Sequence, residues 1–254
     1  MGGVVHLVGA GPGAADLLTL RAARLIAVAD VLVHDRLVSP EILALAPAAT
    51  PRVDVGKAPG RHPVPQHEIN RMLRELARDN ACVVRLKGGD PMIFGRGGEE
   101  ADFLRAHGVR VEVTPGVTAA QGAAASLGLA LTDRNRASGL RFVTGHRCAA
   151  ARDDLDWRGL ADPATTLCIY MGHGRIGEFA ARLIAHGRDP ATPARAVCDA
   201  TRPTERTMLA PLSDIARRAR EARFEGAVLF IVGAAAAQAS ADVAIWEAAD
   251  AAAG

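Results

Sequence analysis

Residues 83–100 read VVRLKGGDPMIFGRGGEE, and the rest of the chain can be understood from this stretch. Its apolar start, up to Leu86, predicts a buried β-strand that a lysine and two glycines bring to an end. Paired glycines remove side chains where a backbone must come close to a partner. Asp90 follows the carboxyl end of the strand, where open α/β sheets bind ligands. The stretch therefore predicts part of a binding site, and the simpler alternative is an elaborate surface loop.

Strands and helices alternate along the first 134 residues, in the pattern of a parallel α/β sheet. Short apolar runs predict the strands, and apolar residues at helical spacing predict the helices between them. The expected strands are 4–8, 31–33, 52–55, 82–86 and 109–113. Glycine, aspartate, lysine or arginine follows each of the first four strands. Because parallel strands end at the same edge of a sheet, we expect these loops to form one shared site.

The loop after the first strand reads GAGPGA over residues 9–14 and matches the dinucleotide-binding pattern GxGxxG/A. This match, with Asp35 downstream, raises the alternative of an NAD-dependent oxidoreductase. Pro12 argues against that alternative, because proline removes a backbone donor from the loop that would hold a pyrophosphate. The same loop could hold the amino-acid part of a methionine-like ligand by close backbone approach.

The pattern restarts after a short polar segment, residues 131–139, which we interpret as a linker. Apolar runs then predict strands at 140–144, 166–171, 195–198 and 227–233, with helices at 176–186 and 214–223. The expected fold class is therefore α/β, with two α/β domains of mostly parallel sheets. Their expected extents are residues 1–134 and 135–254.

Composition limits the class of protein. The chain has 254 residues, of which 49% are hydrophobic and 23% charged, so it can bury a core. A net charge of +2 gives no argument for nucleic acid. The sequence has no apolar run long enough to span a bilayer and no signal-peptide pattern, which favours a cytoplasmic protein. The histidines and cysteines lack the spacing of metal ligands, so we expect no metal and buried, reduced thiols.

Lysine occurs at only two positions, Lys57 and Lys87, in a chain that otherwise uses arginine. Each follows or ends a predicted strand, and each is bordered by glycine. Lysine can lose its proton when it is desolvated, whereas arginine cannot. A role in the site is one interpretation of this usage, and chance is the other.

Motifs spread over nearly the whole chain resemble one known family. The segments that carry the resemblance are VGAGPG (8–13), DRLVSPE (35–41), VGK (55–57), GRH (60–62), RLKGGDP (85–91), FGRGGEE (94–100), TPGVTA (114–119) and VTGH (143–146). They are similar to the uroporphyrinogen-III C-methyltransferases, a branch of the tetrapyrrole methylase family. The first motif is shared across the wider family, and the segments that begin at Asp35 and Gly88 are more specific to this branch.

The resemblance implies a fold and a reaction. The family has a tetrapyrrole methylase fold with the active site in the inter-domain cleft, usually in a homodimer. S-adenosyl-L-methionine is its methyl donor and S-adenosyl-L-homocysteine its product. The implied reaction methylates uroporphyrinogen III at two positions, giving precorrin-2 via precorrin-1 for sirohaem, cobalamin or haem d1 synthesis. The implied partners are these small molecules, with no nucleic acid and no membrane.

Position by position, the resemblance also assigns site residues. The cofactor-binding set is Pro12, Gly88, Gly89, Asp90, Ile93, Thr118, Ala119, Met171 and Ala200. The candidate catalytic residues are Asp35 as proton acceptor, Lys57 as proton donor, and Glu99. The substrate has many carboxylates, which Arg36, Arg61, Arg96 and Arg134 could bind bidentately. Asp35 and Glu99 could each stabilise a methylated, positively charged ring, and the sequence does not rank them.

Three departures from the family pattern leave the product pattern open. The chain reads LTDRN over 131–135 where the family usually has Leu-Thr-His-Arg-Asp. Gly172-His173-Gly174 replaces the usual small apolar residue after Met171, and Met92 stands where phenylalanine is common. Two further alternatives therefore remain: a precorrin methylase that acts later in corrinoid synthesis, and a non-catalytic module that binds tetrapyrroles.

Overall fold

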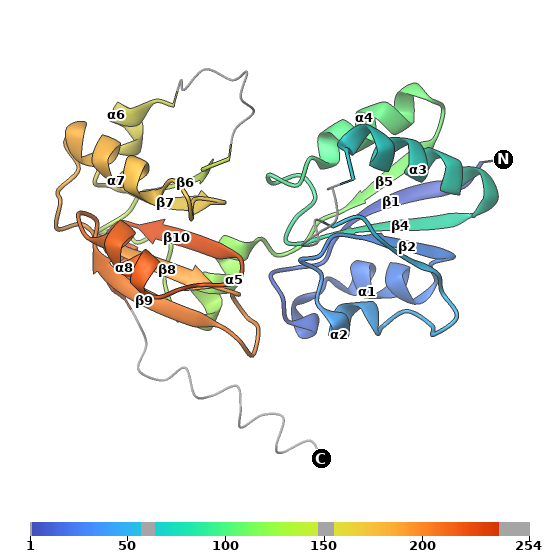
Figure 1. Cartoon of the computed structure of the whole chain (residues 1–254), viewed down its shortest axis with the longest axis horizontal. Coiled ribbons are helices and arrows are strands. Elements are labelled where there is room, and N and C mark those ends of the chain that lie inside the picture. Colours follow the sequence, from blue (N-terminus) through green and yellow to red (C-terminus); the bar gives the residue numbers. More distant parts are fainter. Residues whose placement is uncertain (1, 57–63, 147–154, 239–254) are drawn as a thin grey trace, which may run out of the picture. The chain divides into compact units, whose positions relative to one another are not determined.

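The computed structural model describes residues 2–56, 64–146 and 155–238 (Figure 1). The chain divides into two compact units, Met1–Ala119 and Ala120–Gly254. In the described ranges, each unit forms a five-stranded sheet with helices packed on it.

The sheet of the first unit is parallel throughout. Its strands lie in the order β3 (Arg52–Asp54), β2 (Val31–His34), β4 (Cys82–Lys87), β1 (Val4–Gly9) and β5 (Arg110–Thr114). The central strand β4 pairs in parallel with both β1 and β2. The expected parallel sheet is confirmed, and all five strands end at the same edge.

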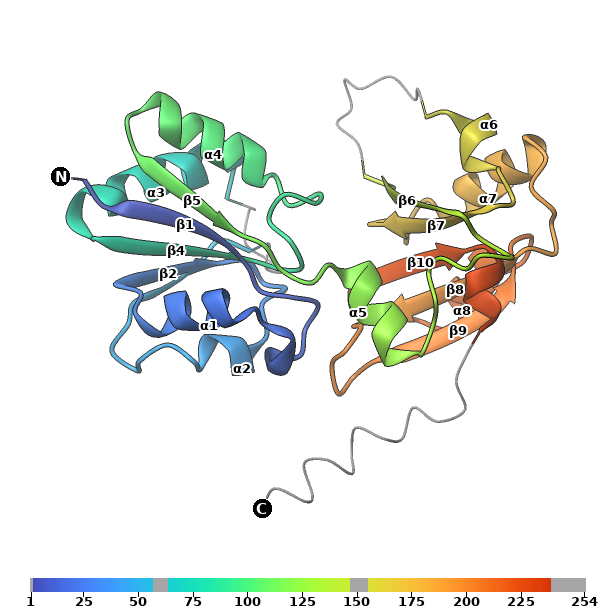
Figure 2. The same ribbon diagram turned by 180° about the vertical axis from the view of Figure 1, so that it is seen from behind.

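Helices cover both faces of this sheet (Figures 1 and 2). On one face lie α1 (Leu20–Ala27) and α2 (Pro40–Leu43), and on the other lie α3 (Gln66–Asp79) and α4 (Gly97–Ala106). Successive residues of a strand point to opposite faces, so each strand supplies two cores. Val83 belongs to the core under α3 and α4, and Val84 and Leu86 belong to the core under α1 and α2.

The sheet of the second unit is mixed. Its order is β6 (Gly139–Thr144), β7 (Thr165–Tyr170), β10 (Val228–Val232), β8 (Pro193–Cys198) and β9 (Arg206–Pro211). The pair β6–β7 is parallel, whereas β10 runs antiparallel to both its neighbours and β9 antiparallel to β8. The expectation of mostly parallel sheets therefore holds for the first unit and not for the second. Strands β6, β7 and β8 still share one direction, so their carboxyl ends lie at one edge.

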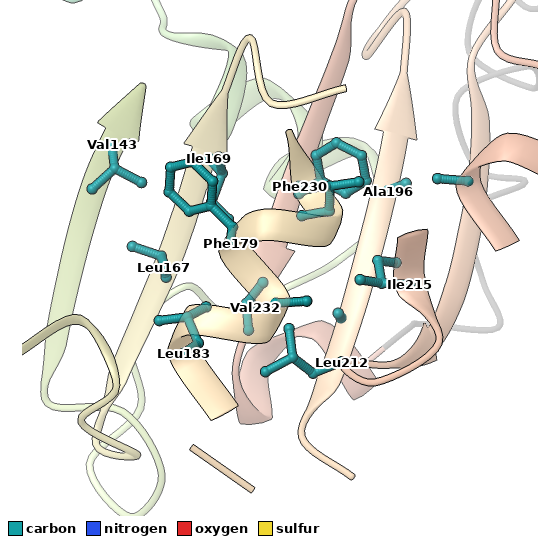
Figure 3. Packing of buried hydrophobic residues seen from close by; sticks show 14 of the residues in the cluster. Val143, Leu167, Ile169, Phe179, Leu183, Ala196, Leu212, Ile215, Phe230 and Val232 are labelled. Carbon is teal, nitrogen blue, oxygen red and sulfur yellow. The ribbon is translucent and has the colours of Figure 1, made fainter. Parts of the chain in front are cut away.

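One face of the second sheet packs against α7 (Ile176–Ala185) and α8 (Ile215–Glu221), with the short α6 (Trp157–Leu160) beside α7. Figure 3 shows Phe179 and Leu183 of α7 over side chains from β7 and β10. Phe179 and Phe230 are fully buried, so the sequence's apolar runs here form a continuous core.

The opposite face of the second sheet is covered by α5 (Ala119–Ser126). Ala120, Ala123 and Leu127 pack in one cluster with Cys168 and Ile231 of the sheet. This packing explains why the second unit begins at Ala120, before the linker at 131–139, whereas the sequence-based boundary falls after residue 134.

Two further elements differ from the expectation. The strand β9 was not predicted, and its residues are mostly exposed, as befits the edge of a sheet. The helix α2 has only four residues, although Ser39 and Pro40 mark its start as expected.

In the described ranges, the model has no helix that is both long and apolar enough to cross a membrane. Cys82, Cys168 and Cys198 are free thiols, and burial raises the pKa of Cys168 to about 12.

Candidate functional site

The loops after β1 and β4 are joined by backbone hydrogen bonds at the carboxyl edge of the first sheet. Gly11 N donates to Gly89 O at 3.2 Å, and Gly89 N donates to Gly11 O at 2.7 Å. A Cβ atom on Gly9 would lie 2.5 Å from Gly116 N, so the loop after β5 is equally close. Glycine is required here because three backbones meet without room for side chains.

Asp90 connects two of these loops through its carboxylate. Its Oδ1 accepts a hydrogen bond from Met92 N at 2.8 Å, and its Oδ2 accepts one from Gly116 N at 3.1 Å. Gly89, just before it, has a φ of +68°, which a residue with a side chain rarely adopts. Asp90 therefore fixes the loop after β4 against the loop after β5.

Most of the predicted cofactor-binding residues of the first unit lie around this junction. Gly89 lies close to Thr118 and Ala119, since a Cβ on it would be 3.8 Å from Thr118 Cα and Ala119 N. Ile93 N donates to Asp90 O at 3.3 Å in the same turn. Pro12 follows Gly11 in the first loop and is half-buried. Gly88 lies on the side of the loop after β2, where its Cβ would be 3.0 Å from Leu37 Cβ.

A cluster of buried charges lies beside this junction, at the ends of β2 and β4. Arg85 Nη2 is 2.6 Å from Asp35 Oδ1 and 3.3 Å from Glu100 Oε1. Lys87 Nζ is 2.8 Å from Glu100 Oε1 and 3.9 Å from Asp35 Oδ2. The side chains of Arg85, Lys87 and Glu100 are 2%, 3% and 0% exposed, and that of Asp35 is 31% exposed. Asp35 is thus the member of the cluster that solvent or a ligand can reach.

The surroundings of Lys87 determine the direction in which its pKa shifts. Burial lowers the pKa of Lys87, and the neighbouring Arg85 cation lowers it further. Glu100 and Asp35 oppose this effect. Neither Arg85 nor Glu100 was a predicted site residue, although both lie within residues 83–100. A signal for Glu100 exists in the sequence, because it precedes Ala101 and Leu104 on the buried side of α4.

Arg96 and Glu99 form a separate, exposed pair at the start of α4. Arg96 Nε donates to Glu99 Oε1 at 2.9 Å, and Arg96 Nη2 donates to Glu99 Oε2 at 2.6 Å. The hydrogen bonds from Arg96 lower the pKa of Glu99. Arg96 has a φ of +59°, and Phe94 in the same loop has a φ of +54°. A non-glycine residue in the left-handed backbone conformation costs about 1–3 kcal/mol, and such residues cluster at functional sites.

The remaining predicted residues of the first unit follow β2 and β3. Arg36 is exposed. A Cβ on Gly56 would be 2.6 Å from Arg36 N, so the loops after β2 and β3 are in contact. Lys57 and Arg61 lie outside the described residues. The structure therefore brings together the loops after all five strands of the first sheet, as far as they are described.

In the second unit, the predicted residues Met171 and Ala200 follow β7 and β8, whose carboxyl ends share an edge. Met171 has a φ of +51° and a side chain that is exposed, and Ala200 is buried. Asp199 and Thr201, on either side of Ala200, have φ values of +51° and +65°. The strained backbone at both loops is a signal that the sequence does not give.

Gly172 is one of the departures from the family pattern, and its surroundings give it a structural reason. A Cβ on Gly145 would lie 2.7 Å from Gly172 Cα, so the loops after β6 and β7 are packed backbone to backbone. A Cβ on Gly172 would lie 2.8 Å from Ile169 Cγ2. The absence of a side chain at Gly145 thus lets the two loops meet, and glycine at position 172 avoids a clash with Ile169 of β7. His173 and Gly174, which follow it, are exposed.

Side chains also fix α5 against these loops. The hydroxyl of Tyr170, at the end of β7, accepts a hydrogen bond of 3.1 Å from Ala120 N in the first turn of α5. Glu205 accepts from Thr201 N at 2.5 Å and from Ser126 Oγ at 3.1 Å. The start and end of α5 are therefore tied to the loops that hold Met171 and Ala200.

Arg134, the last predicted substrate residue, is exposed in a turn of the second unit. The turn is closed by the Asp133–Ala137 bridge and by a hydrogen bond of 2.9 Å from Asn135 N to Asp133 Oδ1. Asp133 and Asn135 are both departures from the family pattern, and here Asp133 stabilises the turn itself. Within the described ranges, no group of three or more His, Cys, Asp or Glu residues is arranged to hold a metal ion.

Comparison with known proteins places this geometry in a family. The family model of the tetrapyrrole (corrin/porphyrin) methylases matches residues 4–216. The chain is 54% identical over 237 residues to a uroporphyrinogen-III C-methyltransferase from Paracoccus denitrificans, covering 93% of this chain and 83% of that protein. It is 48% identical over 231 residues to a siroheme synthase from Hahella chejuensis, covering 91% of this chain and 49% of the relative, so it spans about half of that longer protein.

A solved structure of high similarity gives the same result. The uroporphyrin-III C-methyl transferase from Thermus thermophilus, complexed with S-adenyl homocysteine, superposes with a TM-score of 0.79 at 44% identity. The match covers 92% of this chain and 98% of that one. With most of its length matched in sequence and in structure, the chain belongs to the tetrapyrrole (corrin/porphyrin) methylase family.

Proposed function

We propose that the chain is an S-adenosyl-L-methionine-dependent methyltransferase that methylates uroporphyrinogen III on carbon at two positions and gives precorrin-2. The observation that carries the proposal is the gathering of glycine loops and a partly exposed Asp35 at one sheet edge, in a member of this family. The relatives named above as uroporphyrinogen-III or uroporphyrin-III C-methyltransferases support the choice of substrate.

The charge of the predicted cofactor residues favours S-adenosyl-L-methionine over a dinucleotide. These nine residues include one carboxylate, Asp90, and no lysine or arginine. Such a set suits a sulfonium cation, whereas a pyrophosphate would be left without a cation. In the first unit, the backbone of the glycine loops and the small side chain of Ala119 would hold it; Met171 and Ala200 are the contacts predicted in the second unit. The sulfonium supplies a methyl group that is already activated for transfer.

Asp35 is the carboxylate that we assign to the chemistry. Methylation of a pyrrole carbon leaves positive charge on the ring, which a nearby carboxylate stabilises before a proton is lost. Asp35 lies directly after β2, is held by Arg85 at 2.6 Å, and is 31% exposed. Glu99 is 57% exposed and binds Arg96 through both oxygens, so it is less available as a base.

The exposed arginines would bind the carboxylates of the substrate. Arg36 and Arg96 lie at the site edge of the first unit, and Arg134 lies in the second. A hydrogen bond to a charged group contributes about 1.5–3 kcal/mol, so each such contact would strengthen substrate binding about tenfold or more. We also propose that the enzyme is a cytoplasmic homodimer. Analytical ultracentrifugation of the purified chain measures its oligomeric state.

Two measurements test the proposed function. Calorimetry with S-adenosyl-L-methionine and with NAD should give binding of the first alone; binding of NAD instead would favour an oxidoreductase. Anaerobic turnover should then be compared for uroporphyrinogen III and for precorrin-2 as starting substrates. Methylation of uroporphyrinogen III supports the proposal, whereas methylation of precorrin-2 alone would make the chain a later precorrin methylase.

A further inference from the structure

Four charged side chains meet under the end of β4, and of these Asp35 alone has an assigned role. Arg85 and Lys87 are two residues apart on β4 and therefore point to the same face, toward α3 and α4. Glu100, in the first turn of α4, meets both of them, and Asp35 meets both from the loop after β2. Among the described residues, the cluster pairs two cations with two carboxylates.

Glu100 is the buried centre of this cluster. Its Oε1 accepts hydrogen bonds from Lys87 Nζ at 2.8 Å, from Gln66 Nε2 at 3.0 Å and from Arg85 Nη2 at 3.3 Å. Its Oε2 has no hydrogen-bond partner among the described residues, although the side chain is fully buried. A buried carboxylate is costly unless cations compensate its charge, so Glu100 needs Arg85 and Lys87 and, through its hydrogen bonds, helps to hold both in place.

Stability alone is a poor reason for such a cluster. Apolar residues of similar volume usually serve a core as well as a buried ion pair does. The apolar core under α3 and α4 continues to Val83 on this face of β4, and then gives way to Arg85 and Lys87. The change from apolar to charged residues occurs where the strand reaches Asp35, the partly exposed carboxylate.

We infer that Glu100 is a positioning residue for methyl transfer: it fixes the two buried cations, Arg85 and Lys87, that orient the carboxylate of Asp35. The inference rests on the proposed function, in which Asp35 stabilises the methylated ring and accepts its proton. Arg85 Nη2 bridges the two carboxylates directly, at 2.6 Å from Asp35 and 3.3 Å from Glu100. Glu100 acts through these cations, and is separate from the neighbouring Glu99, which is exposed and paired with Arg96.

The pH dependence follows from the groups that face Lys87. These are Arg85 on its own strand, Asp35 after β2, Glu100 on α4 and, as a neutral donor to Glu100, Gln66 on α3. The exposed Glu99 on α4 also feels the charge of Lys87. Burial and Arg85 lower the pKa of Lys87, while Glu100 raises it. Replacement of Glu100 by glutamine removes the negative charge that raises the pKa of Lys87. Lys87 then loses its proton at a lower pH, and neutral Lys87 no longer attracts the carboxylate of Asp35.

The test is the pH profile of kcat for Glu100→Gln, with Asp102→Asn on the same helix as control. Asp102 is 83% exposed and takes no part in the cluster. We expect E100Q to lower kcat at least tenfold, to move the basic limb of the profile to lower pH, and to leave the Kd for S-adenosyl-L-methionine within twofold. D102N should change none of these. A wild-type kcat and basic limb in E100Q would overturn the inference.

A second variant tests the same inference if E100Q does not fold. The double variant Lys87→Met with Glu100→Gln removes one cation and one anion together, so the Arg85–Asp35 pair stays balanced. We expect a folded enzyme with low kcat and no basic limb, and an unchanged basic limb would refute the role of the cluster. If the wild-type chain methylates no tetrapyrrole at all, the proposed function fails instead, and the two failures are distinguishable.

Discussion

Gly116 N donates a hydrogen bond of 3.1 Å to Oδ2 of Asp90, and thereby joins the loops after β5 and β4. Oδ1 of the same carboxylate accepts from Met92 N at 2.8 Å. The carboxylate is therefore both a predicted cofactor contact and the clamp that shapes the cofactor loops. Substitutions at either residue should weaken binding of S-adenosyl-L-methionine more than they weaken binding of the tetrapyrrole.

Asp90→Ala should weaken binding of S-adenosyl-L-methionine at least tenfold, because each lost hydrogen bond to a charged group is worth about 1.5–3 kcal/mol. Asp90→Asn keeps one acceptor oxygen and should weaken it less. Calorimetry on the two variants checks this order, with Asp102→Ala as the exposed control. Unchanged affinity in D90A would remove Asp90 from the site.

Gly116→Ala should lower both stability and cofactor affinity. A Cβ on Gly116 would overlap the carbonyl oxygen of Gly89 and press on Gly9, and neither backbone can move away cheaply. We expect a loss of about 1–3 kcal/mol in the free energy of unfolding, as for other overpacked sites. Gly98→Ala is the matched control, because nothing lies within 4 Å of its Cβ. It should be neutral or stabilising by up to about 1 kcal/mol, since alanine favours the helix.

Denaturant titration of both glycine variants measures these differences. Equal effects of G116A and G98A on unfolding would show that the close approach of the three loops is not a constraint.

Much of this fold can be predicted from the sequence, for identifiable reasons. The parallel sheet follows from short apolar runs separated by helical repeats, as at Val4–Gly9 and Leu20–Ala27. The mixed order of the second sheet does not follow, because β10 enters between β7 and β8 from far along the chain. Arg206–Pro211 has only three apolar residues in a row before its final proline and is mostly exposed, so it lacks the longer apolar run that marks a buried strand.

The candidate site, like the fold, can be predicted from the sequence only in part. Glycine and charged residues after strands predicted the loops that meet, because all strands of a parallel sheet end together. Burial of Arg85 and Lys87 was not predictable, since charged residues are usually exposed unless a partner distant in sequence compensates them. Of the adjacent carboxylates, the family resemblance assigns Glu99, and helix geometry exposes Glu99 while it buries Glu100.

Asp35→Asn should reduce kcat about 100-fold or more, which is the usual contribution of a positioned base, without loss of S-adenosyl-L-methionine binding. Glu99→Gln removes the exposed carboxylate that Arg96 binds, and should cost less than tenfold in kcat. Single-turnover methylation assays on both variants distinguish the two carboxylates. The opposite ranking would make Glu99 the base.

Arg96→Ala should raise the KM for uroporphyrinogen III about tenfold or more, because a charged contact to a substrate carboxylate is worth about 1.5–3 kcal/mol. The affinity for S-adenosyl-L-methionine should stay the same. Arg105→Ala, an exposed arginine on the same helix near Asp102, serves as control. A variant with weakened cofactor binding and normal KM would place Arg96 at the wrong ligand.

The most direct test of the central claim is the mass of the product formed anaerobically from uroporphyrinogen III and S-adenosyl-L-methionine with an isotopically labelled methyl group. The account predicts a tetrapyrrole that carries two labelled methyl groups from the wild-type chain, and almost none from D35N over the same time. An unmodified tetrapyrrole, or one that carries three labelled methyl groups, would contradict it.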